Sequence, residues 1–275
     1  MRKQHPIVWR AIVTVVVVLV LVGGLLAAIM LGQRTLLYFP DTSNPRTVDG
    51  ADDVSFVTAD GLTLRTWLFS PTVEPRDVAV LFFPGNGGNR AGRASVAHQI
   101  AALGYTVLLL EYRGYGGNPG KPTEEGLALD AQAAASYLHD AGFPAGRVIY
   151  VGESLGTGVA SRLATTDQPA AVLLRSPFTS MVDMAKALYP VLPANLLLHD
   201  RYETMLRLPS ITVPITVLAG SADELVPLAQ STTVADNAVS LFRFDVVEGA
   251  GHNDPVWGSA YVADQVDALA RAAIK

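Results

Sequence analysis

Ser154 stands in the sequence Gly152-Glu153-Ser154-Leu155-Gly156, between the apolar run RVIYV and a segment of helical character. This G-x-S-x-G spacing, in a strand–turn–helix setting, is typical of a serine nucleophile held on a sharp turn above a sheet edge. The two glycines suit such a turn because larger side chains would collide with neighbouring backbone. A helix-capping serine is the alternative, and a phosphate loop would need a Gly-Lys-Ser/Thr ending that is absent here. We therefore expect Ser154 to be a nucleophile.

A serine hydroxyl needs a base that takes its proton, and that base needs an acid to fix its tautomer and stabilise its charge. His252, in EGAGHND, follows the last expected strand in a glycine-containing loop, so its ring could lie over the strand ends. Asp223, in LAGSADELVP, follows the strand before it. Asp223 could instead cap the next helix, and Glu224 could take either role. The remaining histidines suit packing, capping or surface roles better than that of a base: His5, His98, His139 and His199.

The stretch LFFPGNGGNR, residues 81–90, places Gly85, Asn86, Gly87 and Gly88 directly behind apolar residues. Glycine lets the backbone bend sharply and expose its N–H groups, as a phosphate cradle or an oxyanion hole requires. The loop has no lysine placed for a nucleotide, and the chain supplies a serine nucleophile instead. We therefore expect an oxyanion hole formed by the backbone N–H groups of Leu155 and Asn86, with Gly87 as an alternative to Asn86.

Strand and helix patterns alternate along most of the chain, which predicts βαβ units and a mostly parallel sheet of about eight strands with helices on both faces. Near-continuous apolar runs suit strands that are covered on both faces. The strands we expect are Val78–Phe83, Thr106–Tyr112, Arg147–Val151, Ala170–Arg175, Ile215–Gly220 and Leu241–Val247. The helices we expect are Ala91–Leu103, Glu124–His139, Leu155–Thr165, Leu228–Asn237 and Val256–Ala273.

Two segments depart from this alternation. An antiparallel pair should open the sheet, because two β-rich runs flank Asp60-Gly61, a strong hairpin signal. Residues 176–210 form an irregular insert that contains several prolines and should lie over the carboxyl ends of the strands, where ligands bind in such sheets. The insert is rich in Leu and Tyr, so it could cover an apolar acyl pocket, or it could be a structural helical cap without influence on specificity.

Residues 11–31 form a 21-residue run without charge, long enough to span the hydrocarbon core of a bilayer. The alternative is a cleaved signal peptide, whose apolar region is shorter and is followed by a small-residue cleavage site that is not evident here. Arg2, Lys3 and Arg10 precede the run and Arg34 follows it. The excess of positive charge favours a cytoplasmic N-terminus and a body, residues 35–275, on the other side of the membrane.

Composition excludes several classes of site. The chain has no cysteine, which removes disulfides, thiolate nucleophiles and cysteine-based metal sites. Residues 1–34 hold four of the 20 basic residues and none of the 25 acidic ones, so the body carries 16 basic and 25 acidic residues, a net charge of −9. A body this acidic is poorly suited to nucleic acid, which is bound by basic patches. Composition carries no signal of oligomeric state.

Several stretches together resemble the α/β-hydrolases, and more narrowly their membrane-anchored BEM46-like branch of serine hydrolases. These are QRTLLYFP, FFPGNGGNR, EYRGYGGNPGKPTEEGL, VGESLGTGVA, RSPFTSMVDMA, AGSADELVP and GAGHND, which cover most of the chain from Gln33 onward. The order Ser154, Asp223, His252 is also that of the α/β-hydrolases. One departure stands out: where the family usually has His-Gly-Asn, this chain has Pro84-Gly85-Asn86.

The resemblance implies hydrolysis of an acyl ester or thioester in a small-molecule or lipid substrate, with Ser154, Asp223 and His252 as the triad and no metal or cofactor. Peptide hydrolysis is the enzymatic alternative, because one fold hosts many activities. A catalytically inactive, membrane-tethered binding module is the alternative from another class. An intact triad counts against the inactive module, and the missing histidine at Pro84 counts slightly for it.

Overall fold

A computed structural model describes residues 6–274. Within these residues the main sheet has eight strands in the order β10-β9-β8-β7-β4-β6-β3-β2. The pairs from β10 to β6 are parallel, whereas β3 pairs antiparallel with both β6 and β2. The strands are β2 (Ala51–Val57), β3 (Thr63–Phe69), β4 (Ala79–Phe83), β6 (Thr106–Leu109), β7 (Val148–Glu153), β8 (Ala171–Arg175), β9 (Ile215–Gly220) and β10 (Leu241–Val247).

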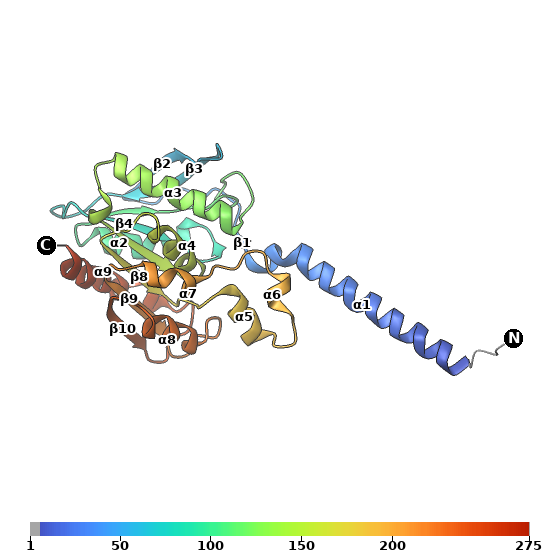
Figure 1. The fold of residues 1–275 in the computed structure, drawn as a ribbon. Helices are drawn as coiled ribbons and strands as arrows, with labels where there is room; N and C mark the ends of the chain where they lie inside the picture. Colours follow the sequence, from blue (N-terminus) through green and yellow to red (C-terminus); the bar gives the residue numbers. More distant parts are fainter. Residues whose placement is uncertain (1–5, 275) are drawn as a thin grey trace.

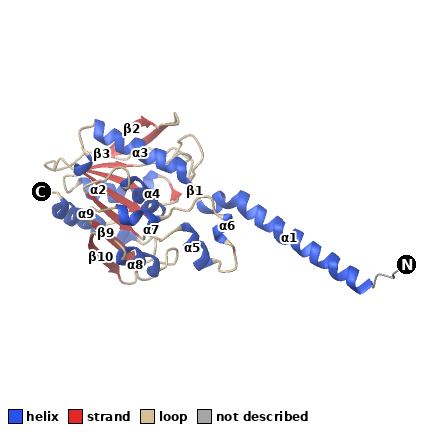
Figure 2. Ribbon diagram, in the orientation of Figure 1, coloured by secondary structure: helices blue, strands red, loops and turns tan. Residues whose placement is uncertain are grey.

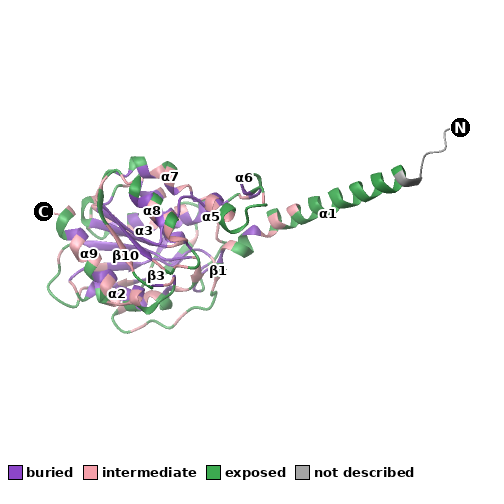
Figure 3. Cartoon of the chain, turned by 90° about the horizontal axis from the view of Figure 1, so that it is seen from below, coloured by how far each residue is buried: buried purple, intermediate pink, exposed green. Residues whose placement is uncertain are grey.

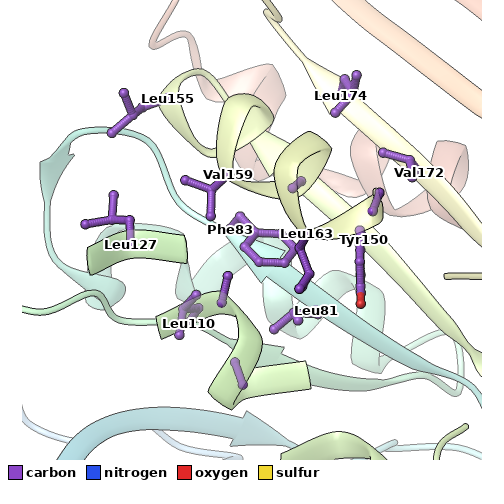
Figure 4. Close-up of a cluster of buried hydrophobic side chains, with 14 of the residues drawn as sticks. Leu81, Phe83, Leu110, Leu127, Tyr150, Leu155, Val159, Leu163, Val172 and Leu174 are labelled. Atoms are coloured by element: carbon purple, nitrogen blue, oxygen red, sulfur yellow. The ribbon is translucent and has the colours of Figure 1, made fainter. Parts of the chain in front are cut away.

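Helices cover both faces of this sheet, as Figure 2 shows. One face carries α2 (Ala94–Ala101) and α9 (Ala260–Ala273), and the apolar residues of that face form one cluster. The other face carries α3 (Glu124–Asp140), α4 (Leu155–Ala164) and α8 (Leu228–Asp236), which contribute to a second cluster. Part of the second cluster, around Phe83, is drawn in Figure 4. The prediction of an α/β sheet with helices on both faces is confirmed.

Alternation along β4 explains why its whole sequence is apolar. Leu81 and Phe83 belong to the cluster under α3 and α4, whereas Val80 and Phe82 belong to the cluster under α2 and α9. Successive side chains of a strand point to opposite faces, so a strand covered on both faces needs apolar residues at every position. All five residues of β4 are buried.

The boundaries of several elements differ from the expected ones. β6 ends at Leu109 rather than at Tyr112. A short 3-10 turn capped by Asn89 precedes α2, so the helix starts later than residue 91. The last helix begins at Ala260 instead of Val256, because Ser259 caps it by accepting a hydrogen bond from the Tyr261 N–H.

A long helix, α1 (Pro6–Leu37), projects from the body (Figure 1). Residues Val8–Leu37 are long and apolar enough to cross a membrane, and Figure 3 shows most of this helix as exposed. Such a helix fits a membrane anchor or a signal sequence. It extends beyond the apolar run at residues 11–31, so that its last turns reach the body.

The helix leads directly into β1 (Phe39–Pro40), which pairs in parallel with β5 (Gly87–Gly88). The segment behind α1 therefore contacts the glycine-rich loop that follows β4. The insert at 176–210 contains α5 (Met181–Leu188), α6 (Ala194–Leu197) and α7 (Thr204–Arg207). Figures 1 and 3 place α6 beside the body end of α1.

Candidate active site

Ser154 occupies a sharp turn between β7 and α4, with φ 50° and ψ −118°. A positive φ is uncommon for a residue with a side chain, and such strain is found where the surrounding structure imposes it. The Ser154 N–H donates to the carbonyl of Arg175 at 2.9 Å, which fixes the turn to β8. A Cβ at Gly156 would lie 2.1 Å from the carbonyl oxygen of Phe83, and one at Gly152 would lie 2.8 Å from that of Gly156. Both positions therefore require glycine.

The structure brings Ser154, His252 and Asp223 together at the carboxyl ends of β7, β10 and β9. His252 Nε2 lies 3.0 Å from Ser154 Oγ, and His252 Nδ1 lies 2.8 Å from Asp223 Oδ2. An ionised carboxylate only accepts hydrogen bonds, so Nδ1 carries the proton that faces Asp223. Nε2 is then left to accept from the Ser154 hydroxyl. His252 and Asp223 are buried at their side chains.

Asp223, and not Glu224, contacts the imidazole ring. Both Asp223 oxygens are occupied: Oδ1 accepts from the N–H groups of Leu225 and Val226, and Oδ2 accepts from Ser176 Oγ at 2.9 Å as well as from His252. Burial alone would raise the pKa of Asp223, but the hydrogen bonds from His252 and Val226 outweigh it and hold the pKa below its usual value. Glu224 faces the backbone N–H of His252 at 3.4 Å.

Ser176 was missed by sequence reasoning. It is buried directly after β8 and has a φ of 50°. Its side chain donates to Asp223, a residue 47 positions away. The RSPF motif that contains Ser176 was a signal of family resemblance, but nothing in its spacing indicated that it contacts the acid.

A buried ion-pair cluster lies beside the nucleophile and was also missed. Glu153 Oε1 lies 2.7 Å from Arg93 Nη2 and 3.0 Å from Arg175 Nη2. Burial alone would raise the pKa of Glu153, but the two guanidinium groups, Arg93 first, lower it to about 2. Arg175 also donates from Nη1 to the carbonyl of His252 at 2.7 Å, so the cluster holds the loop that carries the base.

The glycine-rich loop after β4 is held by hydrogen bonds from several segments. The Asn86 carbonyl accepts from the Phe39 N–H at 2.9 Å and from the Tyr115 hydroxyl at 2.8 Å. The Asn86 side chain donates to the carbonyl of Leu37 at 2.6 Å, and Arg93 Nη1 donates to that of Gly87 at 2.7 Å. The loop is thereby fixed between the end of α1 and the ion-pair cluster.

The backbone N–H groups of Asn86 and Leu155 donate to no other group within residues 6–274. A Cβ at Gly85, next to Asn86, would lie 3.5 Å from Ser154 Cβ. The loop therefore runs close to the nucleophile, and Leu155 follows Ser154 directly as the first residue of α4. Two such unpaired donors beside a serine hydroxyl are what an oxyanion hole needs.

The other described histidines lie away from this site. The ring of His98 packs edge-on against Phe69, His139 lies beside Asp167, and His199 contacts Gln33. His5 lies outside the described residues. No group of three or more His, Asp or Glu side chains that could hold a metal ion is found in residues 6–274.

Comparisons of the sequence identify the family. Residues 78–202 match the family model for the alpha/beta hydrolase fold. The chain is 42% identical over 251 residues to the uncharacterized protein Rv2307c of Mycobacterium tuberculosis, covering 90% of this chain and 89% of that protein. It is 28% identical over 256 residues to the protein bem46 of Schizosaccharomyces pombe, covering 86% of each. The chain belongs to the BEM46-like α/β hydrolases.

Solved structures agree with this assignment at the level of fold. The α/β hydrolase from Vibrio vulnificus has a TM-score of 0.69 at 19% identity, with 88% of this chain and 91% of that chain covered. The Pyrococcus furiosus esterase Pf2001 has a TM-score of 0.68 at 18% identity, with 86% and 97% covered. The fold of this BEM46-like hydrolase is thus shared with proteins of distant sequence.

Pro84 replaces the histidine that is expected in this hydrolase family. The Pro84 carbonyl accepts a hydrogen bond from the Tyr112 hydroxyl at 3.1 Å. Together with the contacts of Asn86 and Gly87 described above, this bond supplies hydrogen bonding to the loop without a histidine. The loop of this hydrolase is ordered by Tyr112, Tyr115 and Arg93 instead.

A cavity of about 420 Å³ opens beside Ser154 and His252. Its lining is mixed, with the charged residues Arg93, Glu153 and Arg175 and the apolar residues Val96, Leu225 and Trp257. None of the residues that line it comes from the insert at 176–210. Of the two alternatives for the insert in this hydrolase, an apolar pocket cover and a structural helical cap, the lining of the cavity favours the structural cap.

Proposed function

We propose that this protein is a serine hydrolase that cleaves acyl ester or thioester bonds through an acyl-enzyme. The observation that carries the proposal is the position of His252, whose two ring nitrogens lie within hydrogen-bond distance of Ser154 Oγ and Asp223 Oδ2. This is the arrangement of nucleophile, base and acid that acyl transfer requires. Structural neighbours that are described as esterases give further support.

The first half of the proposed reaction forms the acyl-enzyme. His252 Nε2 takes the proton of Ser154 as Oγ attacks the substrate carbonyl carbon, and Asp223 stabilises the resulting imidazolium. The tetrahedral oxyanion accepts hydrogen bonds from the N–H groups of Leu155 and Asn86, with Gly87 as the alternative to Asn86. The bond to the leaving oxygen or sulfur then breaks, and the leaving group takes the proton from His252 Nε2.

The second half releases the acid. His252 removes a proton from water, the oxygen of that water attacks the acyl carbon, and the proton returns to Ser154 Oγ as the ester bond to the enzyme breaks. The first N–H groups of α4 add a favourable field, because the N-terminus of a helix carries a partial positive charge. Every step of this cycle uses groups of the chain and water alone.

The N-terminal helix is proposed to anchor the protein in a membrane, with the hydrolase body on the non-cytoplasmic side. Three basic residues before the apolar run, Arg2, Lys3 and Arg10, against Arg34 alone behind it support this orientation. Tethering to a bilayer favours lipid or lipidated acyl substrates over those that must diffuse from solution.

Labelling of the full chain with a fluorophosphonate probe tests the proposed nucleophile. The probe loses fluoride as Ser154 Oγ bonds to its phosphorus. Ser154→Ala should abolish labelling and His252→Ala should reduce it strongly, while Ser95→Ala, which changes an exposed serine bonded to the Gly258 carbonyl, should label as the wild type does. Undiminished labelling of Ser154→Ala would overturn the proposal.

Turnover separates the enzymatic alternatives. Short-chain p-nitrophenyl esters, acyl thioesters and peptides are offered to the wild type and to His252→Ala. We expect turnover of the ester and the thioester that is lost in His252→Ala. Turnover of peptides alone would indicate a peptidase, and the absence of both probe labelling and turnover would indicate a binding module.

A further inference from the structure

The insert at 176–210 contacts the helix α1 instead of the cavity. The side chain of Gln33 is buried in this contact. Its Nε2 donates to the carbonyl of Leu197 at 3.0 Å and lies 2.7 Å from His199 Nδ1, and its Oε1 accepts from the His199 N–H at 2.8 Å. Arg34 adds an ion pair to Asp200 at 3.0 Å. The insert is thus fixed to the base of the helix.

This contact defines the depth of the insert relative to a bilayer. The apolar run ends at Leu31, and Gln33 lies two residues further along, about 3 Å at the rise of an α-helix. The polar layer on each side of the hydrocarbon core is roughly 5–8 Å thick. If α1 spans a membrane, α6 lies within that layer, because its Leu197 bonds to Gln33.

The end of α5, the turn that follows it and α6 expose large apolar side chains in this region. Leu188, Tyr189, Val191 and Leu196 have exposed fractions of 51%, 58%, 91% and 80%. The turn is closed by hydrogen bonds from the Leu192 N–H to the Tyr189 carbonyl at 3.0 Å and from the Leu196 N–H to the Pro193 carbonyl at 2.9 Å. These four side chains, here called the insert patch, therefore lie within nine residues on a folded turn beside α1.

We infer that the insert patch is a second membrane contact, seated in the headgroup layer of the bilayer that α1 crosses. Leucine and valine gain from burial at the headgroup boundary, and tyrosine is enriched at membrane interfaces. The patch includes Leu196 of α6, and α6 is hydrogen-bonded to Gln33, two residues beyond the apolar run, so the bilayer is the apolar phase at that depth. The inference rests on the proposed membrane anchor and is independent of the chemistry at Ser154.

The chain has no cysteine, so single cysteines can be labelled without a background. The full chain is reconstituted in nanodiscs of phosphatidylcholine and phosphatidylglycerol, and a nitrobenzoxadiazole dye is attached to Val191→Cys or Leu196→Cys. Val239→Cys, 60% exposed between α8 and β10, is the matched control on the body. Val13→Cys, inside the apolar run, reports on the anchor itself.

We expect dyes at 191 and 196 to be quenched at least twofold more by a nitroxide on the lipid headgroup than the dye at 239, and less by aqueous iodide. Equal behaviour of 191, 196 and 239, with the dye at 13 in the bilayer, would overturn the inference and leave the anchor intact. Shielding of 191 and 196 from both quenchers would indicate that the patch is buried against protein, as in a contact with a second copy of this chain, and would also overturn it. A dye at 13 that is open to iodide would remove the anchor and the inference together.

The readout does not depend on catalysis. Ser154→Ala carrying the same dyes should give the same quenching, and fluorophosphonate labelling of the dye-bearing chains with Ser154 intact reports whether each is folded at the site. Failure of the membrane inference and failure of the proposed hydrolase activity are therefore measured separately.

Discussion

Asp223 shows how a single carboxylate is prepared for its proposed role. Its four hydrogen-bond donors come from its own loop, from Ser176 and from His252. Because both oxygens are occupied, the carboxylate cannot turn away from the ring. The sequence alone predicts a nucleophile, an acid and a base, because each of them stands in a short motif behind a strand: Ser154, Asp223 and His252. The supporting residues gave no such local signal, because they act through contacts between segments that are distant in the sequence: Ser176, Arg93 and Arg175.

Asp223→Asn should lower kcat roughly 10³- to 10⁴-fold with little change in KM, because an amide in that position favours the wrong tautomer of His252. Steady-state turnover of a p-nitrophenyl ester measures this. Glu224→Gln is the matched control, since Glu224 touches only the backbone of His252, and its turnover should stay close to that of the wild type. A loss of equal size in both variants would contradict the assignment of Asp223 as the acid.

The carboxylate of Glu153 makes the free energy of unfolding depend on pH in the acid range. Its pKa of about 2 in the folded chain lies below the ordinary value of 4.5, so the unfolded chain binds the proton more tightly. The stabilisation is therefore present above about pH 5 and is lost as the pH falls toward about 2. Urea unfolding at several pH values should show this loss in the wild type and a smaller one in Glu153→Gln.

At neutral pH, Glu153→Gln should itself lower the free energy of unfolding by about 3–5 kcal/mol. The reason is that the buried guanidinium groups of Arg93 and Arg175 lose the negative charge that compensates them. Glu125→Gln is the control, since it removes a carboxylate from an exposed pair with Arg162. Surface pairs contribute about 1 kcal/mol or less. Similar losses in the two variants would mean that the buried cluster contributes no more than a surface pair.

At the scale of elements, the strands were the most predictable feature and the helix starts the least. β4 is apolar throughout, and β8 is apolar up to its last residue, Arg175, because both faces of the sheet are covered. Such apolar runs can be recognised directly in a sequence. The start of α9 depends on Ser259, and a serine becomes a cap only when the chain around it adopts the right conformation. The position of the insert was not predictable, because it depends on Gln33 and Arg34, more than 160 residues away.

The junction of β4 and α4 allows a sharp test of packing. A Cβ at Gly156 would meet the backbone carbonyls of Phe83 and Pro84 at 2.1 and 2.6 Å, so α4 would have to move away from the sheet. We expect Gly156→Ala to lower the free energy of unfolding by more than about 3 kcal/mol. The same variant should also lose labelling by the fluorophosphonate probe. Gly146→Ala, where no atom lies within 4 Å of the added Cβ, should change stability by about 0.5 kcal/mol or less.

Thermal or urea unfolding of the two alanine variants in the same detergent measures the difference. The pair is matched in chemistry, since each adds one methyl group at a glycine with a negative φ. If Gly156→Ala unfolds at the same temperature as Gly146→Ala, α4 can shift over β4 without loss of stability. The proposed need for glycine beside the sharp turn at Ser154 would then be wrong.

At the scale of the whole molecule, the proposed orientation of the body rests on the charges at the two ends of the apolar run. With the N-terminus in the cytoplasm, a cysteine at Val239 should react with a membrane-impermeant maleimide in intact cells that express the full chain. A cysteine at Gln4 should react only after lysis. The reverse pattern would place the body in the cytoplasm and would contradict the proposed orientation.

The contact between β1 and the glycine-rich loop determines where the body can be separated from α1 without loss of contacts on that loop. Asn86, a proposed oxyanion donor, is held by Leu37 and Phe39, and the backbone N–H of Asp41 donates to the Gly88 carbonyl. Proteolytic shedding upstream of Leu37 would release a body with an intact loop, whereas cleavage after Pro40 would remove the strand that supports it. A secreted or shed form should therefore keep the full set of contacts on this loop only if it carries Leu37 at the end of α1 and the strand β1.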